Sequence, residues 1–293
     1  MVQAEEARRR LCEAHGWAES AVELVPVVAS GDKILDRPLA EIGGKALWTK
    51  ELDAWLGEGH VDVSVHSMKD VETIRPESLT IAAVLPRADK RDVLIGAESI
   101  AAVPKGAVVG TSAPRRAAQM LHARPDVTIV TFRGNVATRL GKLEAGEADV
   151  TFLAKAGLDR LGQSDLGVPL DETEWLPAPS QGAIGLECRA DDEVTKAFLA
   201  PLDHAPTRAE VIAERGLLEA LNGNCHSPVA VLADASGDKV TIRAAIFSAD
   251  GAERVEAART IVAGDSAALH AMGADLLARA TPAIHSVFGE RAA

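Results

Sequence analysis

The chain has 293 residues, more than a single hydrophobic core usually supports, so two or three domains are expected. Its formal net charge of −12 argues against a broad surface for duplex nucleic acid or an anionic membrane, so any anion site must be local. No run of roughly 18 or more apolar residues occurs, and the amino end is a charged helical pattern without an apolar signal region. We therefore predict a cytoplasmic protein with neither nucleic acid nor a membrane as a partner.

Alternating strand and helix patterns fill the chain from residue 21 to about 185, which predicts a mostly parallel sheet with crossover helices. The expected strands are 22–28, 61–66, 79–85, 107–110, 127–132 and 149–154. The expected helices are 45–58, 115–123, 135–145 and 155–161. Polar, proline-bearing connectors at 86–92 and 175–182 are candidate domain crossings.

The pattern changes after about residue 204. A helix over 206–221 is followed by two strands joined at 248–251 and by a helix over about 266–281. This order predicts a small α+β unit at the carboxyl end.

Two of the expected strands run into arginine-bearing turns, TSAPRR (111–116) and RGNVATR (133–139), and each turn opens a helix. The window 110–139 holds five arginines and one acid, Asp126, in a chain of net charge −12. This local excess of cations favours an anion site. The alternative is solvated helix surface with ordinary ion pairs, and the pattern does not say which anion would bind.

Helix amino ends offer unpaired N–H groups and a partial positive charge. Thr111, Ser112 and the backbone near Gly134 are therefore candidates to cradle a carboxylate or phosphate. Arginine side chains would complete the site through forked, charge-assisted hydrogen bonds. The arginines at the two turns are Arg115, Arg116, Arg133 and Arg139.

A third strand end carries an acid and a base, Asp70 and Lys69, directly after the strand that contains His66. A carboxylate there can assist proton transfer or stabilise a cation. The alternatives are a turn or helix-cap aspartate and a structural histidine.

The segment GGKALWTKELD (43–53) begins with two glycines and carries Lys45 and Trp48. Glycine freedom suits a mobile loop that closes over a ligand, with Lys45 against a carboxylate and Trp48 as a cover. The alternative is a common helix start with a core-facing tryptophan.

Three cysteines lie far apart, Cys12, Cys188 and Cys225, and their odd number argues for free thiols. Cys225 and His226 alone supply too few ligands for a zinc site, so no metal is expected. Cys225 sits in NGNCHSP (222–228), a surface-turn composition that invites a chemical explanation, because free cysteines are usually buried and inert. Cys12 and Cys188 are interpreted as structural.

Seven blocks occur in one order along the chain: GGKALWTKEL, VHSMKDV, GTSAPRRAAQ, RGNVATRLGKL, LAKAGLDRLG, PSQGAIGLECR and NGNCHSP. Together they resemble the porphobilinogen deaminase family, also called hydroxymethylbilane synthase, over nearly the whole chain. Each block alone is a weak signal, but the ordered set with the family's approximate spacing is specific.

The resemblance implies two α/β domains, similar to a periplasmic binding protein around a cleft, and a small α+β domain that carries a cofactor cysteine. Their bounds would be 1–87 with 183–201, 88–182 and 204–293. It implies a monomeric transferase of porphyrin and heme biosynthesis that condenses four porphobilinogen molecules head to tail. Ammonia leaves at each step, linear hydroxymethylbilane is the product, and a covalent dipyrromethane is the primer.

The resemblance also assigns roles to particular residues. Asp70 would be the catalytic carboxylate that holds pyrrole N–H groups and stabilises the cationic azafulvene left by ammonia. Cys225 would bear the dipyrromethane. Positions that match cofactor contacts are Lys45, Lys69, Asp70, Ser112, Arg115, Arg116, Arg133 and Arg139. Positions that match substrate contacts are Arg133, Arg139, Arg160 and Gln181.

One departure from the family pattern bears on activity, and a second is tolerable. Family members usually begin with a strand that ends in an Arg-x-Ser turn, whereas this chain starts inside the following helix, so Met1 is a candidate internal methionine and the first sheet would lack a strand. Ala113 stands where a serine is common after Thr-Ser. The alternative function is therefore a truncated, inactive or non-catalytic anion-binding module of the same fold.

Overall fold

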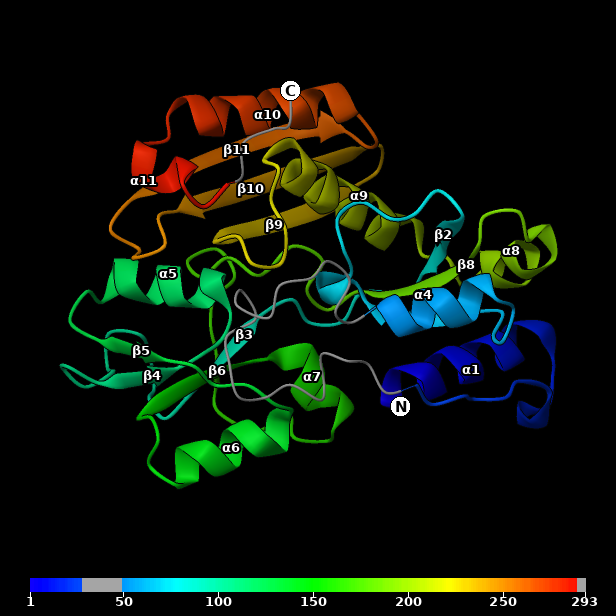
Figure 1. Cartoon of the computed structure of the whole chain (residues 1–293), viewed down its shortest axis with the longest axis horizontal. Helices are drawn as coiled ribbons and strands as arrows, with labels where there is room; N and C mark the ends of the chain where they lie inside the picture. Colours follow the sequence, from blue (N-terminus) through cyan, green and yellow to red (C-terminus); the bar gives the residue numbers. More distant parts are fainter. Residues whose placement is uncertain (28–48, 289–293) are drawn as a thin grey trace.

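The computed structural model describes residues 1–27 and 49–288, and it divides them among three β-sheets, each with its own helices (Figure 1). One three-stranded sheet and one five-stranded sheet lie side by side, and the second three-stranded sheet lies across both (Figure 1). Within the described ranges, no helix is both long and apolar enough to cross a membrane.

The first sheet has the order β1-β8-β2, and its central strand comes from much later in the chain than its neighbours. Its strands are β1 (Ser64–Ser67), β2 (Leu79–Val84) and β8 (Ile184–Arg189). Both outer strands pair antiparallel with β8. The helices around it are α1 (Val2–His15), α4 (Lys50–Gly57) and α8 (Glu193–Leu199), with the short 3₁₀ turns η1 (Glu19–Ala21), η2 (Met68–Asp70) and η3 (Ala200–Leu202).

The second sheet has the order β5-β4-β6-β3-β7. Its strands are β3 (Asp92–Ile95), β4 (Val108–Gly110), β5 (Thr128–Val130), β6 (Val150–Ala154) and β7 (Val168–Pro169). Its helices are α5 (Pro114–Ala123), α6 (Val136–Glu144) and α7 (Lys155–Arg160). The central strand β6 reads VTFLA and is buried over its first four residues, as expected for a strand covered on both faces.

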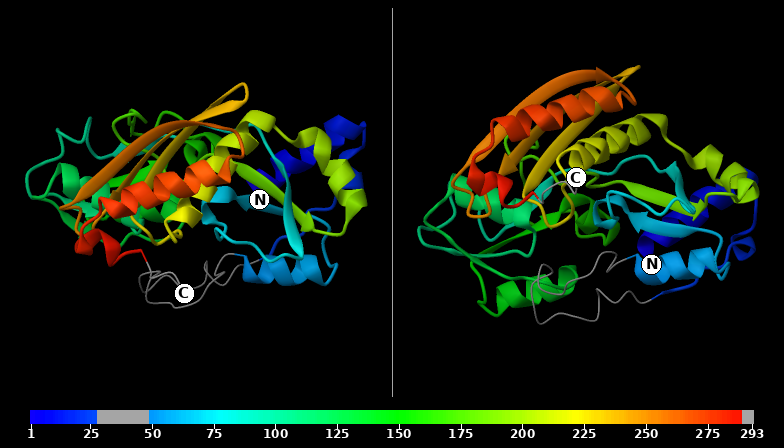
Figure 2. Two further views of the ribbon diagram at one scale, coloured as in Figure 1. Left: turned by 90° about the horizontal axis from the view of Figure 1, so that it is seen from above. Right: turned by 45° about the horizontal axis from the view of Figure 1, so that its top comes forward.

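The third sheet is the antiparallel meander β11-β10-β9. Together with its helices this sheet forms the third unit, which contains α9 (Ala205–Ala220), β9 (Val229–Ser236), β10 (Lys239–Phe247), β11 (Arg254–Val262), α10 (Ser266–Ala278) and α11 (Pro282–His285). Alternate residues of β9 point to opposite faces of the sheet. Helices α9 and α10 lie along one face of this sheet (Figure 2). Val229 and Val231 pack with them there, whereas Ala230 and Leu232 pack with Ala118 of α5 on the other face. The third unit is thus docked on the second.

The predicted fold class, two α/β units with a small α+β unit, is confirmed, and most expected elements lie within a few residues of their predicted bounds. The expected helix over 45–58 is present from residue 50, because residues 45–48 lie outside the described part. The expected helix over 266–281 ends at Ala278, and α11 begins anew at Pro282.

Several predictions of strands were wrong. Residues 22–27 form no strand, although three of the six are β-branched valines, because no described strand pairs with them. The sheets are not mostly parallel: only the β4 pairs with β5 and β6 are parallel among the described strands. The connector over 86–92 ends in β3, and β9 precedes the two expected carboxyl-terminal strands. Period and composition give no strand direction, and β9 is rich in alanine, a poor strand former.

Candidate functional site

A cavity of about 570 Å³ lies where the three units meet, and it collects most of the site residues that the sequence predicts. The predicted residues in its lining are Lys69, Asp70, Ser112, Arg115, Arg116, Arg139, Gln181 and Cys225. Its charged lining consists of four cations and one carboxylate, that of Asp70, among the residues that the structure describes. The local charge is therefore opposite in sign to the net charge of the chain.

Asp70 reaches the cavity because β1 ends in the tight turn η2. The amide of Met68 donates to the carbonyl oxygen of Ala183 at 3.1 Å, and the Met68 side chain is fully buried. A Cβ at Gly185 would lie 2.2 Å from Met68 Sδ, so glycine is needed for this close approach. With Met68 buried beneath it, Asp70 is exposed to the cavity.

Lys69 lies beside Asp70 and is half-buried. Burial lowers the pKa of Lys69, and the charges of Arg116 and Arg115 act in the same direction. The negative charges of Asp70 and Asp92 oppose that shift. An additional carboxylate from a ligand would therefore favour the charged form of Lys69.

Arg115 and Arg116 are held from behind by Asp92, a fully buried residue that the sequence reasoning missed. Arg115 Nη2 donates to Asp92 Oδ2 at 2.8 Å, and Arg116 Nη2 donates to Oδ1 at 2.7 Å. Gln181 Nε2 donates to Oδ1 at 2.8 Å, and Trp175 Nε1 to Oδ2 at 3.0 Å. Burial alone would raise the pKa of Asp92, but the two guanidinium charges hold it well below its usual range. Together, the two arginines and Asp92 carry one net positive charge.

The two helix amino ends differ in how they are capped. The amide of Thr138 in α6 receives a cap from Asn135 Oδ1 at 2.9 Å, and Gly134 before it has a φ of 107°, which a larger residue rarely adopts. By contrast, Ala113 provides no side-chain cap for α5. Because Ser112 and Ala113 line the cavity, the first turn of α5 offers its N–H groups to an anion there.

Arg139 and Arg133 lie near each other on the α6 side. Arg139 Nε donates to the carbonyl oxygen of Gly134 at 3.0 Å, and no carboxylate among residues 1–27 and 49–288 lies within ion-pair distance of it. Burial lowers the pKa of Arg139 to about 10, and Arg116 and Arg133 add to that shift, which Asp70 opposes. Arg133 is buried and lies outside the cavity lining. Burial lowers the pKa of His226, and the charge of Arg133 lowers it further.

Cys225 is exposed at the cavity wall in a loop that follows α9. Asn224 braces this loop, because its amide donates to Ser227 Oγ at 3.1 Å and its Oδ1 accepts from the amide of His226 at 2.8 Å. Partial removal from water raises the pKa of the Cys225 thiol to about 11, and the carboxylate of Asp70 adds to this. Cys12 and Cys188 are buried, as their sequence context predicts.

A second buried network supports the wall beside Asp70. His66 Nε2 lies 2.9 Å from Glu187 Oε2, and Arg75 Nε donates to Glu187 Oε1 at 2.9 Å. Arg75 Nη1 also donates to Glu72 Oε2 at 2.6 Å, which in turn accepts from Thr49 Oγ1. Burial alone would raise the pKa of Glu187, but its bonds to His66 and Arg75 lower it to about 2. His66 is thus a structurally bonded histidine, as one of the two sequence interpretations held.

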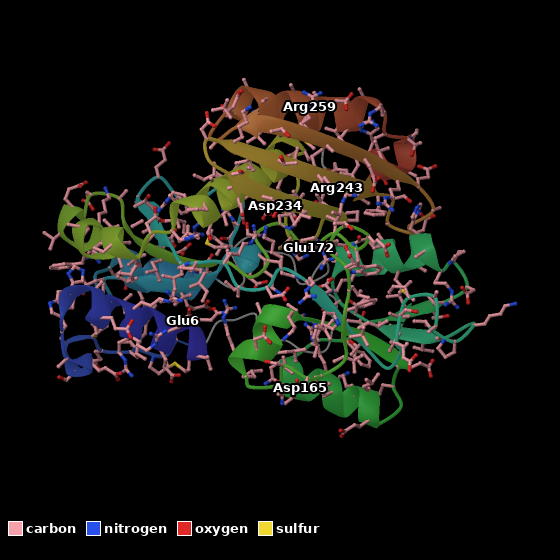
Figure 3. The ribbon with its side chains drawn as sticks, turned by 180° about the vertical axis from the view of Figure 1, so that it is seen from behind. Glu6, Asp165, Glu172, Asp234, Arg243 and Arg259 are labelled. Atoms are coloured by element: carbon pink, nitrogen blue, oxygen red, sulfur yellow. The ribbon has the colours of Figure 1, made fainter. Side chains whose placement is uncertain are left out.

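Arg160, like Arg133, is a predicted site residue that the structure does not bring into the cavity lining. Arg160 Nη2 lies 3.3 Å from the carbonyl oxygen of Gly182, and Nε lies 3.9 Å from Glu6 Oε2 on α1. Figure 3 labels Glu6 at the end of α1 that faces α7, so this contact joins the first and second units. Lys45 lies outside the described residues. Within the described ranges, no cluster of three or more acidic, histidine or cysteine side chains could hold a metal.

Comparison with known proteins gives a consistent result. Residues 1–197 match the family model described as "Porphobilinogen deaminase, dipyromethane cofactor binding domain", and residues 208–279 match "Porphobilinogen deaminase, C-terminal domain". The chain is 54% identical to a porphobilinogen deaminase of Sphingopyxis alaskensis, over 98% of this chain and 93% of that protein. It is 47% identical to one of Paracoccus denitrificans, over 94% and 88%.

Among solved structures, the chain is similar to the periplasmic VFT2 domain of BvgS from Bordetella pertussis. The TM-score is 0.40 at 15% identity, over 73% of this chain and 81% of that one. This likeness is too distant to bear on function. The family matches and the curated relatives, which span nearly the whole chain, show that it belongs to the porphobilinogen deaminase family.

Proposed function

We propose that Cys225 carries the dipyrromethane cofactor of this family and that Asp70 is the catalytic carboxylate beside it. The observation that supports this most directly is that both side chains line one cavity, in which every other charged side chain among the described residues is cationic. The two are close enough for the charge of Asp70 to raise the pKa of the Cys225 thiol.

The reaction of the family joins four porphobilinogen molecules head to tail, releases ammonia at each step and ends by hydrolysis to linear hydroxymethylbilane. When bound, dipyrromethane supplies the carbon to which the first substrate is joined. Asp70 accepts hydrogen bonds from pyrrole N–H groups and stabilises the positive charge left on the substrate as ammonia departs. Its attraction to that charge is stronger in a partly enclosed cavity than in water.

The cavity fits a dipyrromethane by its size, its thiol and its charge. A volume of about 570 Å³ lies in the usual range for small-molecule sites, roughly 300–1,000 Å³. The buried Nε of Arg115 has no hydrogen-bond partner, and the first turn of α5 has no side-chain cap. These unpaired donors suit carboxylate groups, of which each pyrrole brings two.

The remaining site residues divide by their contacts. In this proposal Lys69, Ser112, Arg115, Arg116 and Arg139 bind carboxylates of cofactor or substrate directly. Gln181 donates to Asp92 and to the carbonyl oxygen of Lys90, so it acts by holding the arginine pair in place. Arg133 adds positive charge behind Arg139, and Arg160 joins two units. Lys45 keeps its predicted role as a ligand to a carboxylate.

The proposed domains are residues 1–87 with 183–201, residues 88–182 and residues 204–293. The return of β8 to the centre of the first sheet supports a discontinuous first domain. We also propose that the chain acts as a monomer in the cytoplasm, with porphobilinogen as its substrate and no nucleic acid or membrane partner. The alternative of a non-catalytic binding module is not favoured, since it gives no role to Cys225 or to the third unit.

Intact-mass measurement of protein made in cells tests the proposal. We expect the wild type and a Cys12→Ser control to carry the added mass of one dipyrromethane, and Cys225→Ser to lack it. Asp70→Asn should fold and lose at least about 100-fold in turnover, as expected when a group that stabilises transition-state charge is removed. An unmodified mass from active wild-type protein, or normal porphobilinogen consumption by Asp70→Asn, would refute the assignment.

A further inference from the structure

Arg215 lies on α9 of the third unit, yet its guanidinium contacts the backbone of the segment that carries Asp70. Arg215 Nη1 donates to the carbonyl oxygens of Met68 at 3.4 Å and Val71 at 3.3 Å. Arg215 Nη2 donates to the carbonyl oxygens of Thr73, at 3.0 Å, and Glu72. Four carbonyls from a stretch of six residues thus converge on one side chain, which does not itself line the cavity.

These contacts have a clear chemical cause. The chain leaves β1 at this point and makes a tight turn, so its carbonyl groups have no sheet partners and need other donors. A guanidinium offers five N–H donors in a rigid, planar fork, so it can bridge carbonyls that lie farther apart than the three donors on the single nitrogen of an ammonium can reach. Arg215 is therefore suited to fix the path of residues 68–73.

Arg215 forms no direct ion pair with any of the described residues. Burial lowers the pKa of Arg215 to about 10, with a further contribution from Arg75, while the more distant charges of Glu187, Glu72 and Glu219 oppose that shift. An apolar side chain would fill the same space without this desolvation cost, so packing alone does not account for an arginine here.

The same segment is also fastened to the loop of Cys225. Thr73 Oγ1 donates to the carbonyl oxygen of Gly223 at 3.2 Å, and the amide of Gly223 donates to the carbonyl oxygen of Leu218 in α9 at 2.8 Å. One helix therefore holds the Asp70 segment through Arg215 and leads directly into the loop that bears the thiol. The relative position of carboxylate and thiol depends on α9.

We propose that Arg215 is a positioning residue that sets the place of the Asp70 carboxylate relative to the group carried on Cys225. The inference rests on the proposed roles of Asp70 and Cys225. Arg215 acts through the backbone of residues 68–73 and touches neither substrate nor cofactor.

The test compares Arg215→Met and Arg215→Lys with a matched control, Arg208→Met, all as full-length holoenzyme. Arg208 also lies on α9 and bonds backbone carbonyls, but those of Ile81 and Ala82 in β2. The loaded fraction is measured by intact mass, and kcat and KM for porphobilinogen are measured per loaded enzyme, well below each variant's unfolding midpoint.

We expect Arg215→Met to load its cofactor and to lose about 10- to 100-fold in kcat, the scale of a catalytic group misplaced by about 1 Å, with little change in KM. Arg215→Lys should recover only part of the loss. Arg208→Met should keep wild-type kcat per loaded enzyme even where its Tm falls. If Arg215→Met does not fold, Arg215→Lys becomes the deciding variant. If neither variant loads the cofactor, Thr73→Val becomes the deciding variant, because it frees the other end of the segment.

Two results would overturn the inference: wild-type kcat per loaded enzyme in the deciding variant, or a rise in KM at unchanged kcat. A double variant with Asp70→Asn adds a sharper test, because a residue that acts through Asp70 has no further effect once that carboxylate is gone. Additive losses would contradict positioning. If Asp70→Asn alone keeps its turnover, the proposed role of Asp70 fails; if only the Arg215 variants do, the positioning inference alone fails.

Discussion

The two arginine turns, 111–116 and 133–139, look equivalent in sequence but are built differently. At the first turn, Arg115 and Arg116 share the buried carboxylate of Asp92, and α5, the helix to which they belong, has no side-chain cap. At the second, Asn135 caps the helix, and Arg139 has no carboxylate in ion-pair range among the described residues. At the first turn two guanidinium groups share one buried carboxylate in a rigid array, whereas at the second turn Arg139 can still gain an ion pair from a ligand carboxylate.

Removal of Asp92 should have the largest effect on stability, because it leaves two buried guanidinium groups without their partner. We expect Asp92→Asn to lower the free energy of unfolding by about 3–5 kcal/mol, the range for a broken buried ion pair. Chemical denaturation at neutral pH measures this. A loss below about 1 kcal/mol would mean that Asp92 does not hold the first turn, and Arg139→Gln is the matched variant from the second turn.

Acid should weaken the first turn more than the second. The pKa of Asp92 in the folded protein lies below its ordinary value of 3.8, so its contribution is complete above about pH 4 and is lost as the pH falls. Glu187 behaves alike, with a folded pKa of about 2 against 4.5, and contributes roughly 3 kcal/mol that disappears between those values. Unfolding free energies measured from pH 6 downward should fall less steeply for Asp92→Asn than for the wild type. Parallel curves would contradict this.

Arg139→Gln should separate stability from activity at the second turn. Because Arg139 is half-buried and has no carboxylate partner among the described residues, we expect its loss to change the free energy of unfolding by less than about 1 kcal/mol. The loss of a charged hydrogen bond to a ligand carboxylate should lower kcat/KM by roughly 10- to 100-fold. Steady-state kinetics beside denaturation curves would show this, and a large loss of stability with unchanged kcat/KM would reverse the contrast between the turns.

The smallest effects concern the helix caps. Ala113→Ser places a hydroxyl at the uncapped start of α5 and should stabilise the protein by about 0.5–1 kcal/mol, while Asn135→Ala should cost α6 about 1 kcal/mol. Thermal unfolding of both variants measures these two changes in stability. Destabilisation by Ala113→Ser would show that the first turn of α5 is already satisfied.

Local sequence was sufficient for most helices and for the candidate residues at strand ends, since each depends on a few consecutive positions. It predicted that Lys69, Asp70, Ser112, Arg139 and Cys225 carry the site, and the structure brings these five to one cavity. It also placed Arg115 and Arg116 there but gave no indication that one acid restrains both. The only available signal for Asp92 was an acid directly before the apolar run VLI, which is easily assigned to a connector.

The sequence by itself determined the family, through seven ordered blocks whose residue types and spacing can be recognised without knowledge of the fold. Only the tertiary structure decided which charges meet: Asp92 lies 23 positions from Arg115, and Arg215 lies 147 positions from Met68. It also decided strand direction, because β8 enters the first sheet between strands far earlier in the chain. Such contacts depend on long-range packing and hydrogen bonding, for which neighbouring residues carry no pattern.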